Sequence, residues 1–316
     1  MRLPKSIVQV FGTYSLLVAF AGCSSGSQQV SPTETIPSLS VNRATSTPSG
    51  TLAPIVFASN LNNDVVGYSQ KTGSTIETLS GFNEVDGLAT DRHGSLYVPS
   101  QLQHAVFVYP YLSGTPSLTL NTPSNDPTDV AVSRRGQVCV VEWNSSSGAF
   151  SVAFFKSGAS APFNTLSVSF MTVMRGCAYD ANGNVYVTGF GSKKNGEVGY
   201  LAGGGHGTSV VDLNITSVAQ PSGLQVAKNG NVLVGDQSAA TIHEFQPDSN
   251  NEVGRVLLDR NIVEFALTSD NKHVWATDNS DDSVTEFNFP GGGSPRKTIA
   301  APTLTQAVAV TPWSAP

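Results

Sequence analysis

One stretch decides how this chain folds: residues 86–98 read DGLATDRHGSLYV. Two short runs of apolar and β-branched residues flank a polar turn that contains Asp91 and Gly94, which is the pattern of a tight β-hairpin. Related stretches follow at 129–140, 176–187, 223–234 and 264–276. Positions 87, 129, 176, 223 and 264 are equivalent in this alignment. The chain therefore repeats one unit with a period of about 44 residues.

Each repeat continues beyond the hairpin. A third apolar run follows, for example at 106–109 or 242–245, and then a loop and a weaker fourth run such as 117–120. Four strands in about 44 residues is typical of a β-propeller blade. Because no window has a sustained 3.6-residue periodicity, we expect an all-β domain.

The two ends of the repeat region predict how the ring closes. Residues 55–59 match the second strand of a repeat, and residues 306–311 match the first strand. The C-terminal strand should therefore complete the N-terminal blade, which leaves no open sheet edge there. Residues 54–316 then form a six-bladed β-propeller with one composite blade and five continuous ones.

The repeat motifs resemble NHL repeats and the related gluconolactonase-like six-bladed propellers. The resemblance rests on Asp86-Gly87-Leu88-Ala89 and on Gly183-Asn184-Val185-Tyr186-Val187, and it covers residues 54–311. In the gluconolactonase-like enzymes, the resemblance implies one divalent cation in the central channel, held by a Glu, two Asn and an Asp. Asp86 stands at the Asp position, whereas Arg175 and Ser222 replace the asparagines.

The residues just before each inner-strand apolar residue are the candidates to face the channel. They are Asp86, Thr128 or Asp129, Arg175, Ser222, Val263 and Gln306. Asp86, Asp129 and Arg175 are the candidate ligand-binding residues at the channel mouth, which is a usual place for a ligand. The alternative is that these three side chains pair with one another and only satisfy the channel wall.

The N-terminus predicts export. Arg2 and Lys5 precede a mostly apolar run that ends in Phe20-Ala21-Gly22-Cys23. This end resembles the bacterial lipoprotein signal, which implies cleavage after residue 22 and a lipid on Cys23. Residues 23–53 are rich in Ser, Thr and Pro and have the composition of a flexible tether. We expect a protein that is lipid-anchored to a bacterial membrane, in the periplasm or at the cell surface.

The amino-acid composition limits the classes of partner that the protein is expected to bind. The formal net charge is −6, so binding to nucleic acid by phosphate neutralisation is not expected. The partner is then an envelope protein or a small ligand, and the protein itself is expected to be a monomer. Cys139 and Cys177 occupy core positions in neighbouring blades, either as buried thiols or as a disulfide.

The sequence favours a non-enzymatic binding or scaffolding module without a cofactor. The alternative is a metal-dependent hydrolase of gluconolactonase type, or a lyase, with its site in the central channel. Only this alternative requires a divalent cation.

Overall fold

The computed structural model describes residues 54–60, 62–123, 125–192, 195–278, 280–301 and 305–311. These residues form 24 β-strands and one short 3-10 helix, η1 (Gln101–Gln103). No helix in these ranges is long and apolar enough to cross a membrane. The predicted signal at 1–22, the lipid-bearing Cys23 and the tether at 23–53 lie outside the described residues.

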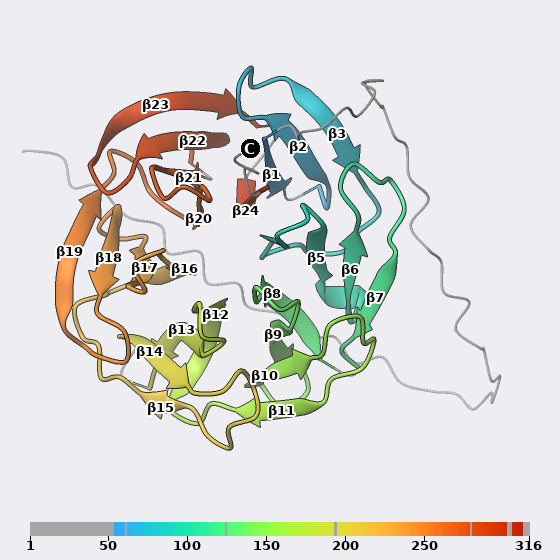
Figure 1. Ribbon diagram of the computed structural model, residues 1–316, viewed down its shortest axis with the longest axis vertical. Helices are drawn as coiled ribbons and strands as arrows, with labels where there is room; N and C mark the ends of the chain where they lie inside the picture. The colour runs from blue at the N-terminus through green and yellow to red at the C-terminus, as the bar shows by residue number, and fades with distance from the viewer. Residues whose placement is uncertain are drawn as a thin grey trace, which may run out of the picture. The chain divides into compact units, whose positions relative to one another are not determined.

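The strands form six antiparallel sheets of four strands, which stand as blades in a ring (Figure 1). This arrangement confirms the predicted six-bladed β-propeller. Blade 1 consists of β24 (Thr305–Val310), β1 (Ile55–Asn60), β2 (Val65–Ser69) and β3 (Thr75–Leu79). Blade 2 consists of β4 (Ala89–Thr90), β5 (Leu96–Ser100), β6 (Ala105–Tyr109) and β7 (Leu118–Asn121). Blade 3 consists of β8 (Asp126–Val132), β9 (Val138–Asn144), β10 (Ala149–Phe155) and β11 (Asn164–Ser167).

The other three blades follow the same order from the centre outward. Blade 4 consists of β12 (Met171–Tyr179), β13 (Val185–Gly191), β14 (Gly196–Leu201) and β15 (Val211–Asp212). Blade 5 consists of β16 (Pro221–Val226), β17 (Val232–Asp236), β18 (Thr241–Phe245) and β19 (Glu252–Leu257). Blade 6 consists of β20 (Glu264–Leu267), β21 (His273–Asp278), β22 (Ser283–Asn288) and β23 (Gly292–Ala300).

The hydrophobic core lies between neighbouring blades. Six clusters of described residues fill the six boundaries of the ring. Successive side chains of a strand point to opposite faces of its sheet, so one strand supplies two clusters. In β1, Ile55 and Phe57 pack between blades 1 and 2, whereas Val56 and Ala58 pack between blades 6 and 1. This is why the second strand of each repeat reads as an almost continuous apolar run.

The ring closes where the predicted C-terminal strand joins the N-terminal blade. β24 pairs with β1 in antiparallel register, with Val310 opposite Val56 and Ala309 opposite Phe57. Two buried hydroxyls add to this pairing. Thr311 Oγ1 accepts a hydrogen bond from the Ile55 amide at 2.9 Å, and Ser59 Oγ accepts one from the Ala307 amide at 2.9 Å. β24 also reaches blade 6, because Thr277 Oγ1 donates to the Gln306 carbonyl at 2.8 Å.

Deletion of residues 303–316 should open the ring. The variant loses the inner strand of blade 1, including the buried Val308 and Val310. Each buried valine contributes about 1.5–3 kcal/mol, and the freed β1 edge can pair with another chain. We expect a melting temperature lower by roughly 10 °C or more, with dimers or larger species in size-exclusion chromatography. Deletion of residues 312–316 alone is the control. A monomeric 303–316 deletion with an unchanged melting temperature would contradict this closure.

Candidate functional site

The inner strands of the six blades place one equivalent residue each around the central channel. The second strand of each blade pairs with the inner strand. In every blade the channel-facing residue lies three positions before the last inner-strand residue of that pairing. We call these six positions the channel ring. It consists of Gly87, Asp129, Gly176, Gly223, Glu264 and Ala307. Two acids therefore stand among four residues without a long side chain, on blades 3 and 6, which are opposite each other in a six-bladed ring.

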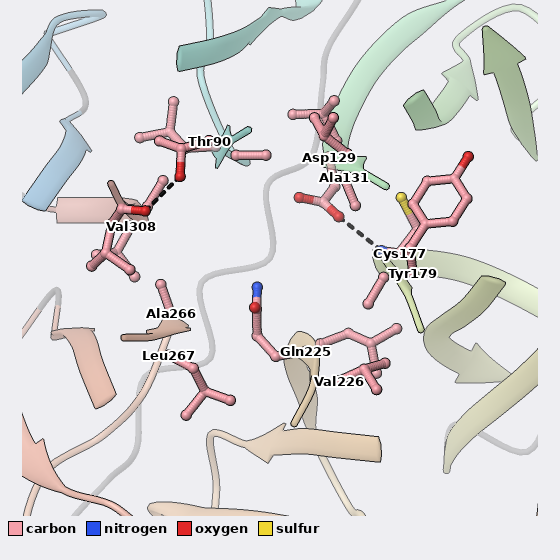
Figure 2. Close-up of a pocket in the computed structure, with 18 of the residues that line it drawn as sticks. Thr90, Asp129, Ala131, Cys177, Tyr179, Gln225, Val226, Ala266, Leu267 and Val308 are labelled. Carbon is pink, nitrogen blue, oxygen red and sulfur yellow. Dashed lines mark hydrogen bonds between the residues drawn. The ribbon is translucent and has the colours of Figure 1, made fainter. Parts of the chain in front are cut away.

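A cavity of about 270 Å³ lies along the channel, and both acids line it. Figure 2 shows Asp129 at this cavity. Two positions after the channel ring, five blades carry alanine and blade 5 carries Gln225. In Figure 2 the Gln225 side chain points into the middle of the cavity. Thr90, Asp91 and Arg92 also line this cavity. Small residues keep the channel open, and a few polar groups are left facing it.

Asp129 links blade 3 to blade 4. Its Oδ2 accepts a hydrogen bond from the Cys177 amide at 2.8 Å, as Figure 2 shows, and the Val130 amide also donates to this carboxylate. Gly87 in blade 2 makes room for it, since a Cβ at position 87 would lie 2.7 Å from the Asp129 Cα. Only glycine fits at position 87, because the chain there passes so close to the inner strand of blade 3.

Glu264 is the second acid of the channel ring, and it is not among the channel residues predicted from the sequence. Its Oε1 accepts a hydrogen bond from the Phe265 amide at 3.0 Å, and a Cβ at Gly223 would overlap this carboxylate. The sequence predicts Val263 as the channel-facing residue of blade 6, and this prediction is wrong because Val263 does not line the cavity. The signal in the sequence is the alignment of position 264 with the glycines at 87, 176 and 223 and with Asp129, because an acid there stands where three other repeats have glycine.

Both acids hold their protons more tightly than ordinary carboxyl groups. Burial raises the pKa of Asp129 to about 7; the amides of Cys177 and Val130 oppose this shift, and the charge of Asp86 adds to it. Burial also raises the pKa of Glu264 well above its usual range, and the charge of Asp129 adds to the effect. The low-dielectric wall of the channel disfavours two negative charges on opposite sides of one cavity.

The structure separates the three residues that the sequence singled out. Asp129 lines the cavity, whereas Asp86 and Arg175 precede the channel ring and do not line it. Asp86 Oδ2 accepts a hydrogen bond from Gln101 Nε2 at 2.6 Å. Burial raises the pKa of Asp86, while Gln101 and the positive charge of Arg175 lower it. The Arg175 guanidinium carbon lies 5.9 Å from the centre of the Phe190 ring.

The predicted alternative is that Asp86, Asp129 and Arg175 form ion pairs with one another. Among the described residues, Asp86, Asp129 and Arg175 form no ion pair within 4 Å. They influence one another only through longer-range charge, as the shifts of the Asp86 and Asp129 pKa values show.

The donor set does not fit the divalent cation that the gluconolactonase-like resemblance implies. The positions expected to supply two asparagines carry Arg175, which is exposed, and Ser222, whose buried Oγ has no hydrogen-bond partner. Within the described ranges, no three His, Cys, Asp or Glu side chains lie close enough together to hold a metal ion. Hard cations prefer several convergent oxygen ligands, and the channel ring offers two carboxylates that are bonded elsewhere.

Cys139 and Cys177 form a disulfide, with their Cα atoms 6.9 Å apart. Of the two states left open by the sequence, the structure has the bridge and not the pair of free thiols. The bridge joins β9 to β12, so Cys177 is tied to blade 3 twice, through its sulfur and through its amide on Asp129.

The comparisons with known proteins bear on the fold. No family model matches the sequence, and no curated protein matches it. A solved structure of a nidogen/laminin complex contains a similar chain, with a TM-score of 0.65 and 14% identity over 81% of this chain and 98% of that one. A Bacteroides caccae protein of unknown function has a TM-score of 0.64 and 12% identity, over 82% and 99% of the two chains. Hydrazine synthase of Kuenenia stuttgartiensis has a TM-score of 0.55 and 14% identity, over 78% and 98%. At such identities these likenesses support the propeller fold alone.

The pKa of Asp129 predicts how stability depends on pH. Between its ordinary value near 4 and about 7, the folded protein binds more protons at Asp129 than the unfolded chain does. The free energy of unfolding should therefore fall as the pH rises through this window, with a contribution of roughly 1–4 kcal/mol from Asp129. We expect Asp129→Asn, which is neutral at every pH, to lose less melting temperature between pH 4.5 and pH 8 than the wild type. The exposed Glu84→Gln is the matched control; equal slopes in all three proteins would refute the assignment.

Proposed function

We propose that the protein is a non-enzymatic binding module, exported and held at a bacterial membrane by a lipid on Cys23. The observation that carries this proposal is that the carboxylates of the channel are bonded within the fold. Asp129 accepts amides of its own blade and the next, and Glu264 accepts an amide of its own strand. A carboxylate whose lone pairs are taken by backbone amides has fewer of them to offer a substrate, and a catalytic site needs several groups that converge on one reacting atom.

Two further observations support the proposed export and the proposed kind of partner. The Cys139–Cys177 disulfide is in keeping with an oxidising compartment outside the cytosol. The nidogen/laminin complex contains a propeller of similar fold as one component of a protein assembly. By that analogy we propose an envelope protein or a small ligand as the partner, with no nucleic acid, and a monomeric propeller on a tether. The NHL-like and gluconolactonase-like resemblance remains a prediction.

Mass spectrometry and labelling test the anchor. We expect the purified protein to begin at Cys23 with the added mass of acyl chains, and to take up labelled palmitate in the cell. Cys23→Ser should abolish the label because the thiol is the site of lipid attachment, and Ser24→Ala should retain it. A wild-type mass that begins at Met1, or a label that persists in Cys23→Ser, would refute the lipid anchor.

The alternative is a hydrolase or lyase with its site in the channel, and one observation favours it. Asp129 has a pKa of about 7 beside a cavity of about 270 Å³, and strongly shifted carboxyl groups in cavities are candidates for acid–base catalysis. Under this alternative a divalent cation would be the cofactor, as in the family that the sequence resembles.

A metal titration separates the two functions. After treatment with a chelator, the melting temperature is measured with calcium, magnesium, manganese or zinc. A cation at 100 times its dissociation constant adds about 2.7 kcal/mol, which corresponds to several degrees for a domain of this size. We expect no saturable rise with any of the four. A rise that is lost in Asp86→Ala and kept in the exposed control Glu84→Ala would replace the binding module with the metal enzyme.

A further inference from the structure

A second hollow of about 760 Å³ lies among the loops of blades 2, 3 and 4, and it differs in charge from the rest of the molecule. We call it the basic groove. Its ionisable lining residues are Arg92, Arg134, Arg135, Lys156, Asp180 and His206. Four of the 17 Lys and Arg residues therefore gather in one concave site of a protein whose formal net charge is −6. Its volume is within the range of small-molecule sites.

The backbone holds the arginines at hairpin tips. In blade 3 the Gly136 amide donates to the Ser133 carbonyl at 2.9 Å, and the Gln137 amide donates to Ser133 Oγ at 2.9 Å. Gly136 has a φ of +78°, as this tight turn requires. The two central residues of the turn, Arg134 and Arg135, consequently face solvent. Arg92 has the corresponding place in blade 2, where the Gly94 amide donates to the Asp91 carbonyl at 3.0 Å.

These positive charges have few partners within the fold. Arg134 and Arg135 make no hydrogen bond or ion pair with any residue that the structure describes. Lys156 Nζ lies 5.8 Å from the centre of the Phe163 ring, and the centre of the His206 ring lies 4.9 Å from it with the two planes tilted by 31°. Phe163 thus positions the Lys156 ammonium group without neutralising it.

The one acid of the basic groove is already engaged. Asp180 Oδ1 accepts the amides of Asn182 and Asn184 at 2.9 and 2.8 Å, and its Oδ2 accepts Asn184 Nδ2 at 2.8 Å. This carboxylate caps its own turn and does not pair with a cation of the groove. Four cationic side chains against this one carboxylate leave the groove with an excess of positive charge.

We propose that the basic groove binds a small soluble polyanion that carries two or more phosphate groups. Guanidinium groups bind phosphate oxygens through paired N–H donors, and a phosphate carries more charge per group than a carboxylate. Cations that are distributed over blades 2 and 3 match several linked phosphates better than a single one. The groove is concave, which suits a molecule that enters it better than a flat membrane surface. This inference deepens the proposed binding function, for which it names a ligand class.

Tripolyphosphate is the probe, with the full chain kept in a mild non-ionic detergent at 50 mM salt. Isothermal titration calorimetry compares the wild type with the double variant Arg134→Gln/Arg135→Gln. The matched control is Lys228→Gln, because Lys228 lies in the corresponding hairpin turn of blade 5 and does not line the basic groove. We expect the double variant to bind at least tenfold more weakly and the control to stay within twofold. All three proteins should keep the same melting temperature, since the altered residues are exposed.

Two comparison ligands test the ligand class. Citrate offers three carboxylates and should bind at least tenfold more weakly than tripolyphosphate. Dihexanoyl phosphatidylglycerol offers a single lipid phosphate and should also bind more weakly. Equal or tighter binding of citrate overturns the phosphate preference, and tighter binding of the lipid overturns the soluble source.

Two further outcomes overturn the site itself. One is no binding of tripolyphosphate at millimolar concentration, and the other is equal binding by the wild type and the double variant. These outcomes are distinct from a failure of the proposed function, which is decided by the lipid on Cys23 and by the metal titration.

Discussion

The pairing of β24 with β1 is the constraint on which the rest of the structure depends. Every blade buries apolar side chains on both faces, and each face needs a neighbouring blade to cover it. An open array of six blades would leave two such faces in water, and it would leave β24 and one edge of β1 unpaired. The pairing of Val310 with Val56 and of Ala309 with Phe57 removes both problems at once. The ring is therefore one cooperative unit although it is built from repeats.

Closure of the ring also determines the chemistry of the channel. Six inner strands converge on one axis, so the residues that face it are close to one another and far from bulk water. Glycine or alanine at four positions of the channel ring leaves room for the acids of blades 3 and 6. Asp129 then uses its carboxylate to hold the Cys177 amide of blade 4, next to the disulfide that joins the same two blades. The raised pKa of Asp129 follows from its placement in a closed, low-dielectric wall.

The two hollows of the molecule differ for a physical reason. The channel cavity is bounded mainly by the inner strands, which present small side chains, the two engaged acids and Gln225 to it. The basic groove is bounded by turns, where side chains are free of the sheet and can keep their charge in contact with water. A scaffold of this kind separates stability, which resides in the blades, from recognition, which resides in the loops.

The sequence by itself determined the fold, its blade count and the strand that closes the ring. Strand periodicity and turn residues are local signals, and every repeat contains them. It also identified Asp129, since the alignment of repeats places that residue on an inner strand. Glu264 is absent from the predicted channel residues because the residue before it is predicted to face the channel; the register of β20 with β21 places Glu264 there instead, in agreement with its alignment to Asp129. The choice between free thiols and the Cys139–Cys177 bridge, and the gathering of Arg92, Arg134, Arg135 and Lys156 in one groove, were decided by tertiary structure alone. Both depend on how neighbouring blades are placed in space, which no single repeat encodes.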